Sequence, residues 1–148
     1  MKFIILILLT VSGCTSRGMQ GKFASLQAKA VSVCKVMSSP TLYVNQRIIV
    51  HGLYFSEPHQ RLLYDHTCPD LSLRVSHSLQ RDGDHGAELI VERFRKKHQT
   101  VKIPVIYSGV LTAAVLINGC TRPSCYTYSL EESQLLAASS QSYMRRDE

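Results

Sequence analysis

The spacing of hydrophobic positions changes several times along this chain, and its first regular stretch has helical spacing. Phe23, Leu26, Ala30, Val33 and Met37 follow one another at intervals of three and four residues. Such intervals place apolar side chains on one face of an amphipathic helix. A proline follows at position 40, and the residue before a proline avoids the helical region. The sequence therefore predicts a helix over 23–37.

Beyond residue 40 the pattern becomes typical of strands, rich in β-branched and aromatic residues. We expect a turn at 42–46, with Asn45 at positive φ, because Asn tolerates that conformation. A second amphipathic helix is predicted from Ala87 to about Lys97. Gly52 and Gly109 fall inside predicted strands, where a glycine typically marks a bend, a bulge or a close backbone approach. Strands are predicted at 47–55, 61–65, 71–76, 101–115 and 126–130.

The first fourteen residues have the pattern of an export signal. One Lys precedes an apolar run from Phe3 to Leu9, and Val11-Ser12-Gly13-Cys14 follows. A basic start, about 7–15 apolar residues and a small-residue cleavage site make a secretory signal. The run is shorter than the roughly 20 residues that span a bilayer. A secretion signal with a chance Cys and an uncleaved membrane helix are the alternatives.

The ending Val11-Ser12-Gly13-Cys14 resembles the bacterial lipobox. That resemblance implies cleavage before Cys14, lipidation of this Cys and a mature protein anchored by three acyl chains. Because Thr15 rather than Asp follows the Cys, the resemblance favours the outer membrane, facing the periplasm. We expect residues 1–13 to be the signal peptide, 14–22 a lipidated tether, 23–138 the folded domain and 139–148 a flexible tail.

Length and charge narrow the class of protein. Removal of residues 1–13 leaves 135 residues and lowers the formal net charge from +6 to +5, enough chain for one domain with a single core. A basic balance can indicate an anionic partner. The dense basic cluster at 93–98 is better explained as the solvated C-terminal end of a helix, where basic side chains are favoured by the helix dipole.

The five Cys divide into one for lipid and four for disulfides. Cys34, Cys68, Cys120 and Cys125 are an even number in an oxidising compartment, which predicts two disulfides and allows three connectivities. The turn-like Thr-Arg-Pro-Ser between Cys120 and Cys125 can bring two strand ends together, which leaves Cys34 for Cys68. A four-Cys zinc site is the alternative, although neither pair has the usual tight spacing.

The predicted order is a helix, three strands, a helix and two strands, and the last six elements follow the order of the OB-fold, a small partly open β-barrel. A set of residues along the first half of the chain forms a known pattern: Cys34, Pro40, 43–52, Leu63-Tyr64-Asp65 and Cys68-Pro69. In this pattern the chain resembles small OB-like bacterial envelope proteins of largely uncharacterised function. Asn45 stands where that pattern has Gly. The resemblance covers about residues 31–130 and implies a mainly β, five-stranded OB-like barrel with an N-terminal helix and a helix between strands three and four.

Candidate catalytic and metal-binding groups are scattered. The six His include no H-x-x-x-H pair, and the chain has no Gly-x-Ser-x-Gly motif. Asp82, Asp84 and His85 share a loop but lack the further ligands of a calcium loop. We expect Asp65, at the end of a strand, to cap a turn. The alternative function is a small periplasmic metal-binding protein or hydrolase that uses His66, His77 and His85.

A binding role fits the pattern better than catalysis. OB barrels bind oligomers across the face of strands two and three, and the side chains nearest to such a face are Tyr54, Phe55, Arg61, Tyr64 and His66. The competing interpretation, that most of these aromatics pack in the core, has more weight. The sequence thus predicts a lipid-anchored envelope lipoprotein that acts as a non-catalytic binding or assembly module. We expect no cofactor, no metal and no nucleic acid, and an envelope protein or a glycan as partner.

Overall fold

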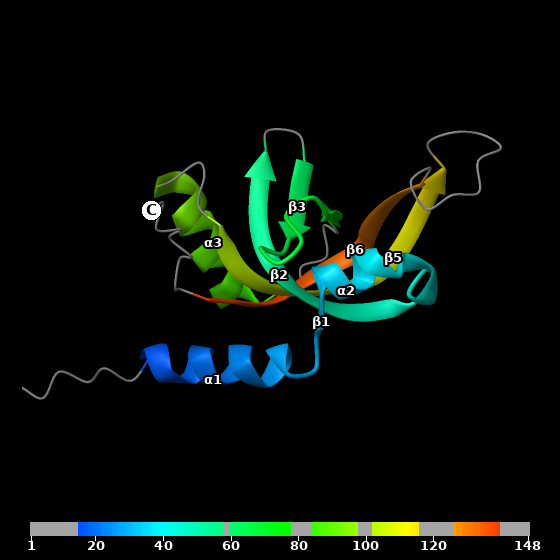
Figure 1. Ribbon diagram of the computed structural model, residues 1–148. Coiled ribbons are helices and arrows are strands. Elements are labelled where there is room, and N and C mark those ends of the chain that lie inside the picture. The colour runs from blue at the N-terminus through cyan, green and yellow to red at the C-terminus, as the bar shows by residue number, and fades with distance from the viewer. Residues whose placement is uncertain (1–14, 58–59, 78–83, 98–101, 116–125, 140–148) are drawn as a thin grey trace, which may run out of the picture.

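The chain folds around one β-sheet with helices packed beside it (Figure 1). The computed structural model describes residues 15–57, 60–77, 84–97, 102–115 and 126–139. Over these residues the protein is mainly β, as the sequence predicts. Cys14, Cys120 and Cys125 lie outside the described residues, as do the predicted signal peptide and most of the predicted C-terminal tail.

The elements appear in the predicted order, with an altered N-terminal part. Helix α1 spans Thr15–Gln27, strand β1 Val31–Ser32, helix α2 Val33–Ser38 and the short 3-10 helix η1 Pro40–Leu42. Strands β2 (Arg47–Glu57), β3 (Gln60–Tyr64) and β4 (Ser72–His77) follow. Helix α3 (His85–Lys97) then leads to β5 (Ile103–Val115) and β6 (Tyr126–Ala138). The predicted strands are confirmed, and β6 continues through residues whose structure the sequence left open.

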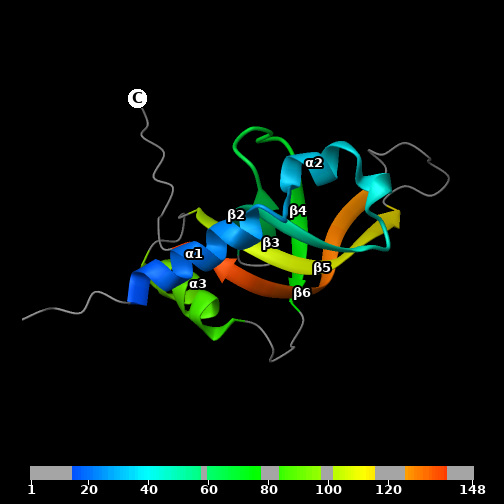
Figure 2. The ribbon, with the colours of Figure 1, turned by 90° about the horizontal axis from the view of Figure 1, so that it is seen from below.

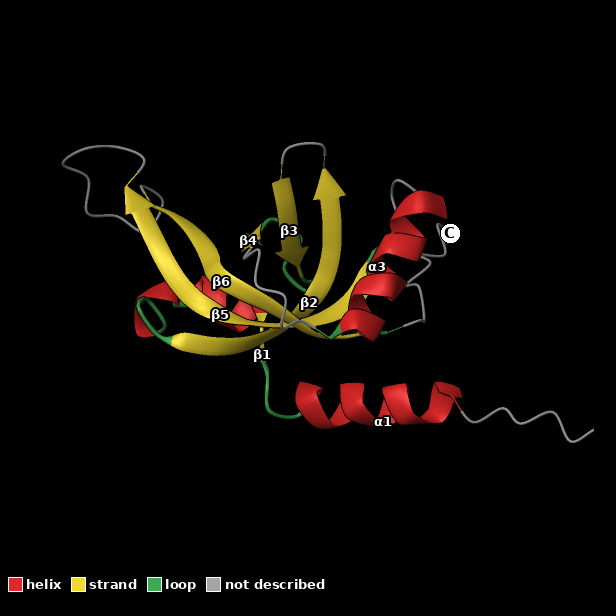
Figure 3. Cartoon of the chain, turned by 180° about the vertical axis from the view of Figure 1, so that it is seen from behind, coloured by secondary structure: helices red, strands yellow, loops and turns green. Residues whose placement is uncertain are grey.

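The strands form a six-stranded sheet in the order β1-β2-β3-β4-β6-β5, with an additional pairing of β2 with β5. Antiparallel pairs join β2 to β3, β3 to β4, β5 to β6 and β2 to β5, whereas β4 and β6 are parallel. A path that follows these pairings from β2 through β3, β4, β6 and β5 therefore leads back to β2. Figure 3 shows β5 and β6 continuing past β2, whose pairing with β5 ends at Arg47↔Val110.

One face of the sheet carries the main hydrophobic core. Buried apolar side chains alternate along the strands with more exposed ones, as the two-residue period of a strand requires. Helix α2 contributes Val33 and Val36 to this core, and α3 contributes Ala87. The fully buried side chains of the strands are mostly branched aliphatic residues: Val50, Leu63, Leu73, Val105, Leu111 and Leu130.

Two glycines and one asparagine occupy positions that restrict the side chain, as predicted. A Cβ at Gly52 would lie 2.8 Å from Cγ2 of Val33, so α2 can approach β2 closely only where the side chain is absent. A Cβ at Gly109 would lie 2.8 Å from the carbonyl oxygen of Glu131, at an irregularity in the β5–β6 register. Asn45 has φ 64°, which confirms the predicted left-handed turn residue.

The predicted helix over 23–37 is wrong. Helix α1 begins at Thr15, inside the segment expected to be a tether, and ends at Gln27. Val31 and Ser32 leave the helix because they pair with Val50 and His51 of β2. The side chain of Ser32 then accepts a hydrogen bond from the backbone N–H of Lys35 and starts α2. Pairing with β2 thus overrides the helical spacing.

A disulfide fixes α2 to the sheet. Cys34 of α2 is bonded to Cys68, which lies between β3 and β4, with a sequence separation of 34 residues. This confirms the predicted pairing of these two Cys. The covalent bond attaches the N-terminal segment to the loop that follows β3, and this loop forms part of the site described below.

Helix α1 covers the face of the sheet opposite the main core (Figure 2). Ile106 of β5 and Ala137 of β6 are buried but lie outside the main core cluster. They alternate with core residues, so their side chains point to the side on which α1 contacts these strands. Phe23 and Leu26 of α1 are half-buried apolar residues. A second, smaller apolar layer therefore lies between α1 and the sheet.

Asp84 connects three elements at the start of α3. Its carboxylate accepts hydrogen bonds from the backbone N–H groups of Gly86 and Ala87 and forms an ion pair with Lys22 of α1. Its own N–H donates to the carbonyl of Leu135 in β6. The ion pair with Lys22 holds the pKa of Asp84 below its usual value, and the two backbone hydrogen bonds lower it further despite partial burial.

None of the helices in the described part of the chain is both long and apolar enough to cross a membrane.

Candidate functional site

A groove of about 200 Å³ opens on the outer face of the sheet, the face covered in part by α1. Its lining comes from four separate segments of the chain. Helix α1 and strand β5 supply one side, and strand β2, the end of β3 and the following loop supply the other. The lining residues are Phe23, Gln27, His51, Gly52, Leu53, Tyr64, Asp65, His66, Pro104 and Val105. We call this feature the outer groove.

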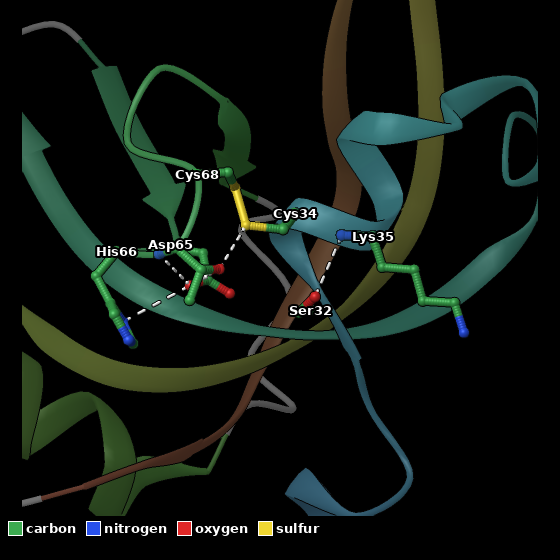
Figure 4. Close-up of polar contacts among 7 residues, drawn as sticks. Ser32, Cys34, Lys35, Asp65, His66 and Cys68 are labelled. Atoms are coloured by element: carbon green, nitrogen blue, oxygen red, sulfur yellow. Dashed lines mark hydrogen bonds and ion pairs between the residues drawn. A yellow bond between two sulfur atoms is a disulfide. The ribbon is translucent and has the colours of Figure 1, made fainter.

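Asp65 is the acidic group of the outer groove. Its Oδ1 accepts hydrogen bonds from the backbone N–H of Thr67 at 3.0 Å and from Oγ1 of Thr67 at 2.8 Å. Nδ1 of His66 lies 3.6 Å from the same oxygen (Figure 4). Asp65 therefore closes a turn after β3, as the sequence predicts.

Asp65 is held as a carboxylate. Burial raises the pKa of Asp65, but the two hydrogen bonds from Thr67 lower it, and the nearby His66 and His51 lower it further. The lowering effects are larger in sum, so the pKa lies below the ordinary value. All the hydrogen bonds and ion pairs described for the Asp65 side chain involve Oδ1. Among the described contacts Oδ2 carries none and remains an acceptor beside the groove.

Tyr64 supplies an aromatic ring and an unusual hydroxyl. Its position opposite Leu53 of β2 places it on the outer face. Nζ of Lys102 lies over the ring, 4.5 Å from its centroid, within the range of a cation–π contact. The hydroxyl oxygen is buried and has no hydrogen-bond partner among the described residues. A buried hydroxyl without a partner costs about 1–3 kcal/mol of stability, and such a group in a native structure needs an explanation.

The disulfide holds the loop side of the outer groove. Cys68 follows Asp65 by three positions, and its N–H donates to the carbonyl of Asp65 at 3.1 Å. Sγ of Cys34 lies 3.0 Å from Oγ1 of Thr67, the same hydroxyl that bonds Asp65. Figure 4 shows the Cys34–Cys68 bond beside Asp65 and His66. The orientation of the carboxylate is thus coupled to the crosslink through Thr67.

The structure does not bring the five predicted binding-face residues onto one surface. Tyr54 is 5% exposed and stacks on Tyr107, with ring centroids 6.4 Å apart, so it belongs to the core. Arg61 lies on the same face of β3 as the core residue Leu63, whereas Phe55 and Tyr64 lie on the outer face of the sheet. His66 lies exposed in the loop. Tyr64 and His66 are the two that line the outer groove.

A second polar cluster lies on the outer face of β4, β5 and β6. Oε1 of Glu131 accepts a hydrogen bond from Oγ of Ser129 at 2.7 Å, and Oε2 accepts one from Oγ of Ser76. Oγ1 of Thr112 lies 3.0 Å from Oγ of Ser129. Ser76 and Ser129 hold the pKa of Glu131 below its usual value by bonding to the carboxylate, and partial burial opposes them. We call Ser76, Thr112, Ser129 and Glu131 the serine–glutamate network.

The residues of the alternative function are not assembled. His66 precedes β4 and His77 ends it, so a strand with a rise of about 3.3 Å per residue separates them. His85 begins α3 and lies 3.6 Å from Glu88. In the candidate cation loop, Asp84 is the N-cap of α3, while Asp82 lies outside the described residues. Within the described ranges, no three His, Cys, Asp or Glu side chains are placed to hold a metal ion.

Sequence reasoning missed most of the outer groove. His51 and Leu53 lie on opposite sides of Gly52 in one strand, while Phe23 and Gln27 come from α1 and Pro104 from β5. No linear spacing joins these positions. The one available signal was Gly52, because a glycine inside a strand indicates a close backbone approach.

Comparison with protein-family models, with curated proteins and with solved structures finds no match to this chain.

Proposed function

We propose that this protein is a lipid-anchored envelope lipoprotein whose OB-like barrel acts as a non-catalytic binding or assembly module. The single observation that carries the binding role is the outer groove, whose lining combines apolar side chains with hydrogen-bonding groups. Binding sites typically combine apolar surface with a few placed polar groups. The serine–glutamate network, by contrast, is occupied with its own hydrogen bonds.

The strand pairings support the barrel. The five long strands pair in a ring, the third and fifth of them are parallel, and a helix lies between the third and fourth. This is the arrangement expected of an OB-like barrel. Gly52 and Gly109 stand where two strands approach other elements most closely, which suits strands that bend to close a barrel.

The position of α1 supports a short anchor. The helix begins at Thr15, one residue after the Cys that the lipobox pattern marks for lipidation. It then contacts β5 and β6. Lipid on Cys14 would therefore hold the barrel beside the membrane surface without a spacer. In this arrangement the helix that follows the anchor also lines the outer groove, through Phe23 and Gln27.

Intact mass of the membrane-extracted protein and a membrane fractionation test the anchor. We expect Cys14 to carry acyl chains and Cys14→Ser to release the protein into the soluble fraction with an unchanged melting temperature, because Cys14 precedes every described element. A free thiol at Cys14 in the native protein would contradict the anchor.

Chemical cross-linking in the native envelope, followed by affinity capture and mass spectrometry, tests the module. One envelope protein recovered reproducibly from the anchored protein, and lost with Cys14→Ser, is the expected result for an assembly module. A glycan recovered in its place supports the binding role. Recovery of neither would contradict the proposed function.

A further inference from the structure

We propose that the outer groove binds one ring of a neutral oligosaccharide. This inference rests on the proposed binding function and names the class of ligand. A sugar ring presents an apolar face of C–H groups and a rim of hydroxyls, each of which both donates and accepts hydrogen bonds. The groove has the matching chemistry, because its lining combines apolar and aromatic side chains with groups that donate and groups that accept.

The apolar lining of the groove comes from several elements. Leu53 and Pro104 stand opposite each other across the β2–β5 pairing and form part of this lining. Tyr64 and Phe23 add aromatic side chains to it. Its volume of about 200 Å³ is below the roughly 300–1,000 Å³ of pockets that enclose drug-sized ligands. The groove therefore suits a single ring whose neighbours along the chain remain outside.

The polar part supplies both halves of the hydrogen bonding that hydroxyls require. Asp65 is ionised and keeps Oδ2 clear of the described contacts, so it accepts from two hydroxyls at most. The imidazole of His51 and the amide of Gln27 both donate and accept. A carboxylate acceptor makes a charge-assisted hydrogen bond, about twice as strong as a neutral one.

The Tyr64 hydroxyl is the second, independent observation. The hydroxyl is buried and has no partner among the described residues, and the Tyr64 residue that carries it is part of the groove lining. A ligand hydroxyl that reaches it would satisfy this atom and recover the cost of its burial. The free protein would then be less stable than it is with Phe at this position, and the bound protein would not.

Charge selects among sugars. Asp65 lies in the groove, while Lys102 lies over the Tyr64 ring. A uronic or sulfated sugar would bring its anion close to the Asp65 carboxylate, which costs binding energy. The groove therefore favours a neutral ring over an anionic one.

Saturation-transfer NMR on the full-length lipidated chain tests this proposal, in a detergent that has no sugar headgroup. The probes are maltotetraose and chitotetraose as neutral chains and tetragalacturonate as the anionic chain. We expect saturation transfer to a neutral probe and an affinity for tetragalacturonate at least tenfold lower. No transfer to either neutral probe at about 10 mM, where even millimolar binding is detected, would overturn the proposal.

Variants locate the site. Asp65→Asn and His51→Gln should each lower the affinity at least tenfold, and His51→Gln leaves the turn at Thr67 intact. The matched controls are Asp70→Asn, in the same loop but outside the groove, and Tyr43→Phe, which removes a hydroxyl elsewhere. Unchanged affinity in both Asp65→Asn and His51→Gln would place the sugar elsewhere and overturn the proposal.

Tyr64→Phe gives a readout that a structural role would not produce. We expect a several-fold loss of affinity together with a melting temperature equal to or above that of the unsubstituted protein. A lower melting temperature would show that the hydroxyl has a structural partner, against the proposal. Cys14 lipidation and envelope capture are measured separately, so the sugar proposal can fail while the anchored module stands.

Discussion

Asp65 and Glu131 are both outer-face carboxylates whose pKa values are lowered by hydroxyl hydrogen bonds, yet they stand in different surroundings. Glu131 has a donor on each oxygen, from Ser129 and Ser76. Asp65 has all its described bonds on Oδ1 and lines a groove beside an unpartnered hydroxyl. A lowered pKa is therefore common to both carboxylates, whereas an oxygen without a described contact beside a groove separates Asp65 from Glu131.

The structural elements that position the two carboxylates, Asp65 and Glu131, also differ. Glu131 lies on β6 among side chains of neighbouring strands, whose backbone pairing fixes their positions. Asp65 lies after the end of β3, in a loop held by a turn and by the Cys34–Cys68 bond. Loss of one support should therefore disturb Asp65 more than Glu131, which the following predictions test.

Removal of the Cys34–Cys68 disulfide should have the largest effect. We expect Cys34→Ser with Cys68→Ser to lower the free energy of unfolding by about 2–4 kcal/mol, because the crosslink restricts a loop of 34 residues in the unfolded chain. Urea unfolding followed by circular dichroism measures the change. The measurement is made in an oxidising buffer, which keeps any other disulfide intact. The double substitution then reports on the Cys34–Cys68 bond alone.

Loss of the disulfide should also separate the two carboxylates. NMR titration of the double variant should show the pKa of Asp65 moving toward its ordinary value while that of Glu131 stays low. An unchanged unfolding curve, or an equal movement of both pKa values, would contradict the coupling of Asp65 to the crosslink.

Glu131→Ala should have the next largest effect. The substitution removes the acceptor that Ser76 and Ser129 share. We expect the free energy of unfolding to fall by roughly 1–2 kcal/mol and not more, because both hydroxyls retain weaker hydrogen bonds to neighbouring groups. Thermal unfolding measures it. Glu132→Ala is the matched control, because Glu132 is exposed and its ion pair with Arg47 contributes at most about 1 kcal/mol. A larger loss with Glu132→Ala would show that the network carries little stability.

The sequence predicted the sheet better than it predicted the N-terminal helix, for a physical reason. Each strand from 47 onward has its own β-branched or alternating pattern, so local propensity and tertiary pairing agree. In 23–37 they disagree: the helical spacing of Leu26 and Ala30 continues into Val33, but the pairing of Val31 with Val50 interrupts it. Such competition between a local pattern and a distant strand is not visible in a single sequence.

The groove was harder to predict than the fold. Tyr64 and His66 were two of the five candidate binding-face residues, and they line the groove. Tyr54 and Arg61 instead lie on the core side of their strands. A shift of one position in a strand reverses the face of a side chain, so a list of nearby aromatics mixes both faces. The contribution of Phe23 depends on where α1 packs, which the sequence does not specify.

Acid should lower stability through three carboxylates, Asp65, Asp84 and Glu131. Because the folded pKa values of Asp65, Asp84 and Glu131 are lowered, their stabilisation is complete above the unfolded pKa of about 4. It is lost as the pH falls from there through the folded pKa values. We expect a constant melting temperature between about pH 6 and 5 and a decrease below about pH 4. Protonation of any one of these carboxylates should cost less stability than Glu131→Ala, because a protonated carboxyl group still accepts hydrogen bonds.

The acid transition sharpens the comparison when it is repeated with Glu131→Ala and with Asp65→Asn. Each variant should show a shallower decrease than the unsubstituted protein, because it has one fewer group to protonate. If both variants kept the full slope, the lowered pKa values would belong to other groups.

Lys22→Gln should have the smallest effect on stability. The Lys22–Asp84 ion pair attaches α1 to the start of α3, but the Lys22 side chain is 54% exposed, so its loss should cost at most about 1 kcal/mol. Local order is the more sensitive measure. Hydrogen exchange should become faster in α1 and stay unchanged in β5, because α1 lies outside the main core. Asp84→Ala, which also removes the N-cap of α3, should cost about 1 kcal/mol more. Equal losses for the two variants would assign the role of Asp84 to the ion pair rather than to the cap.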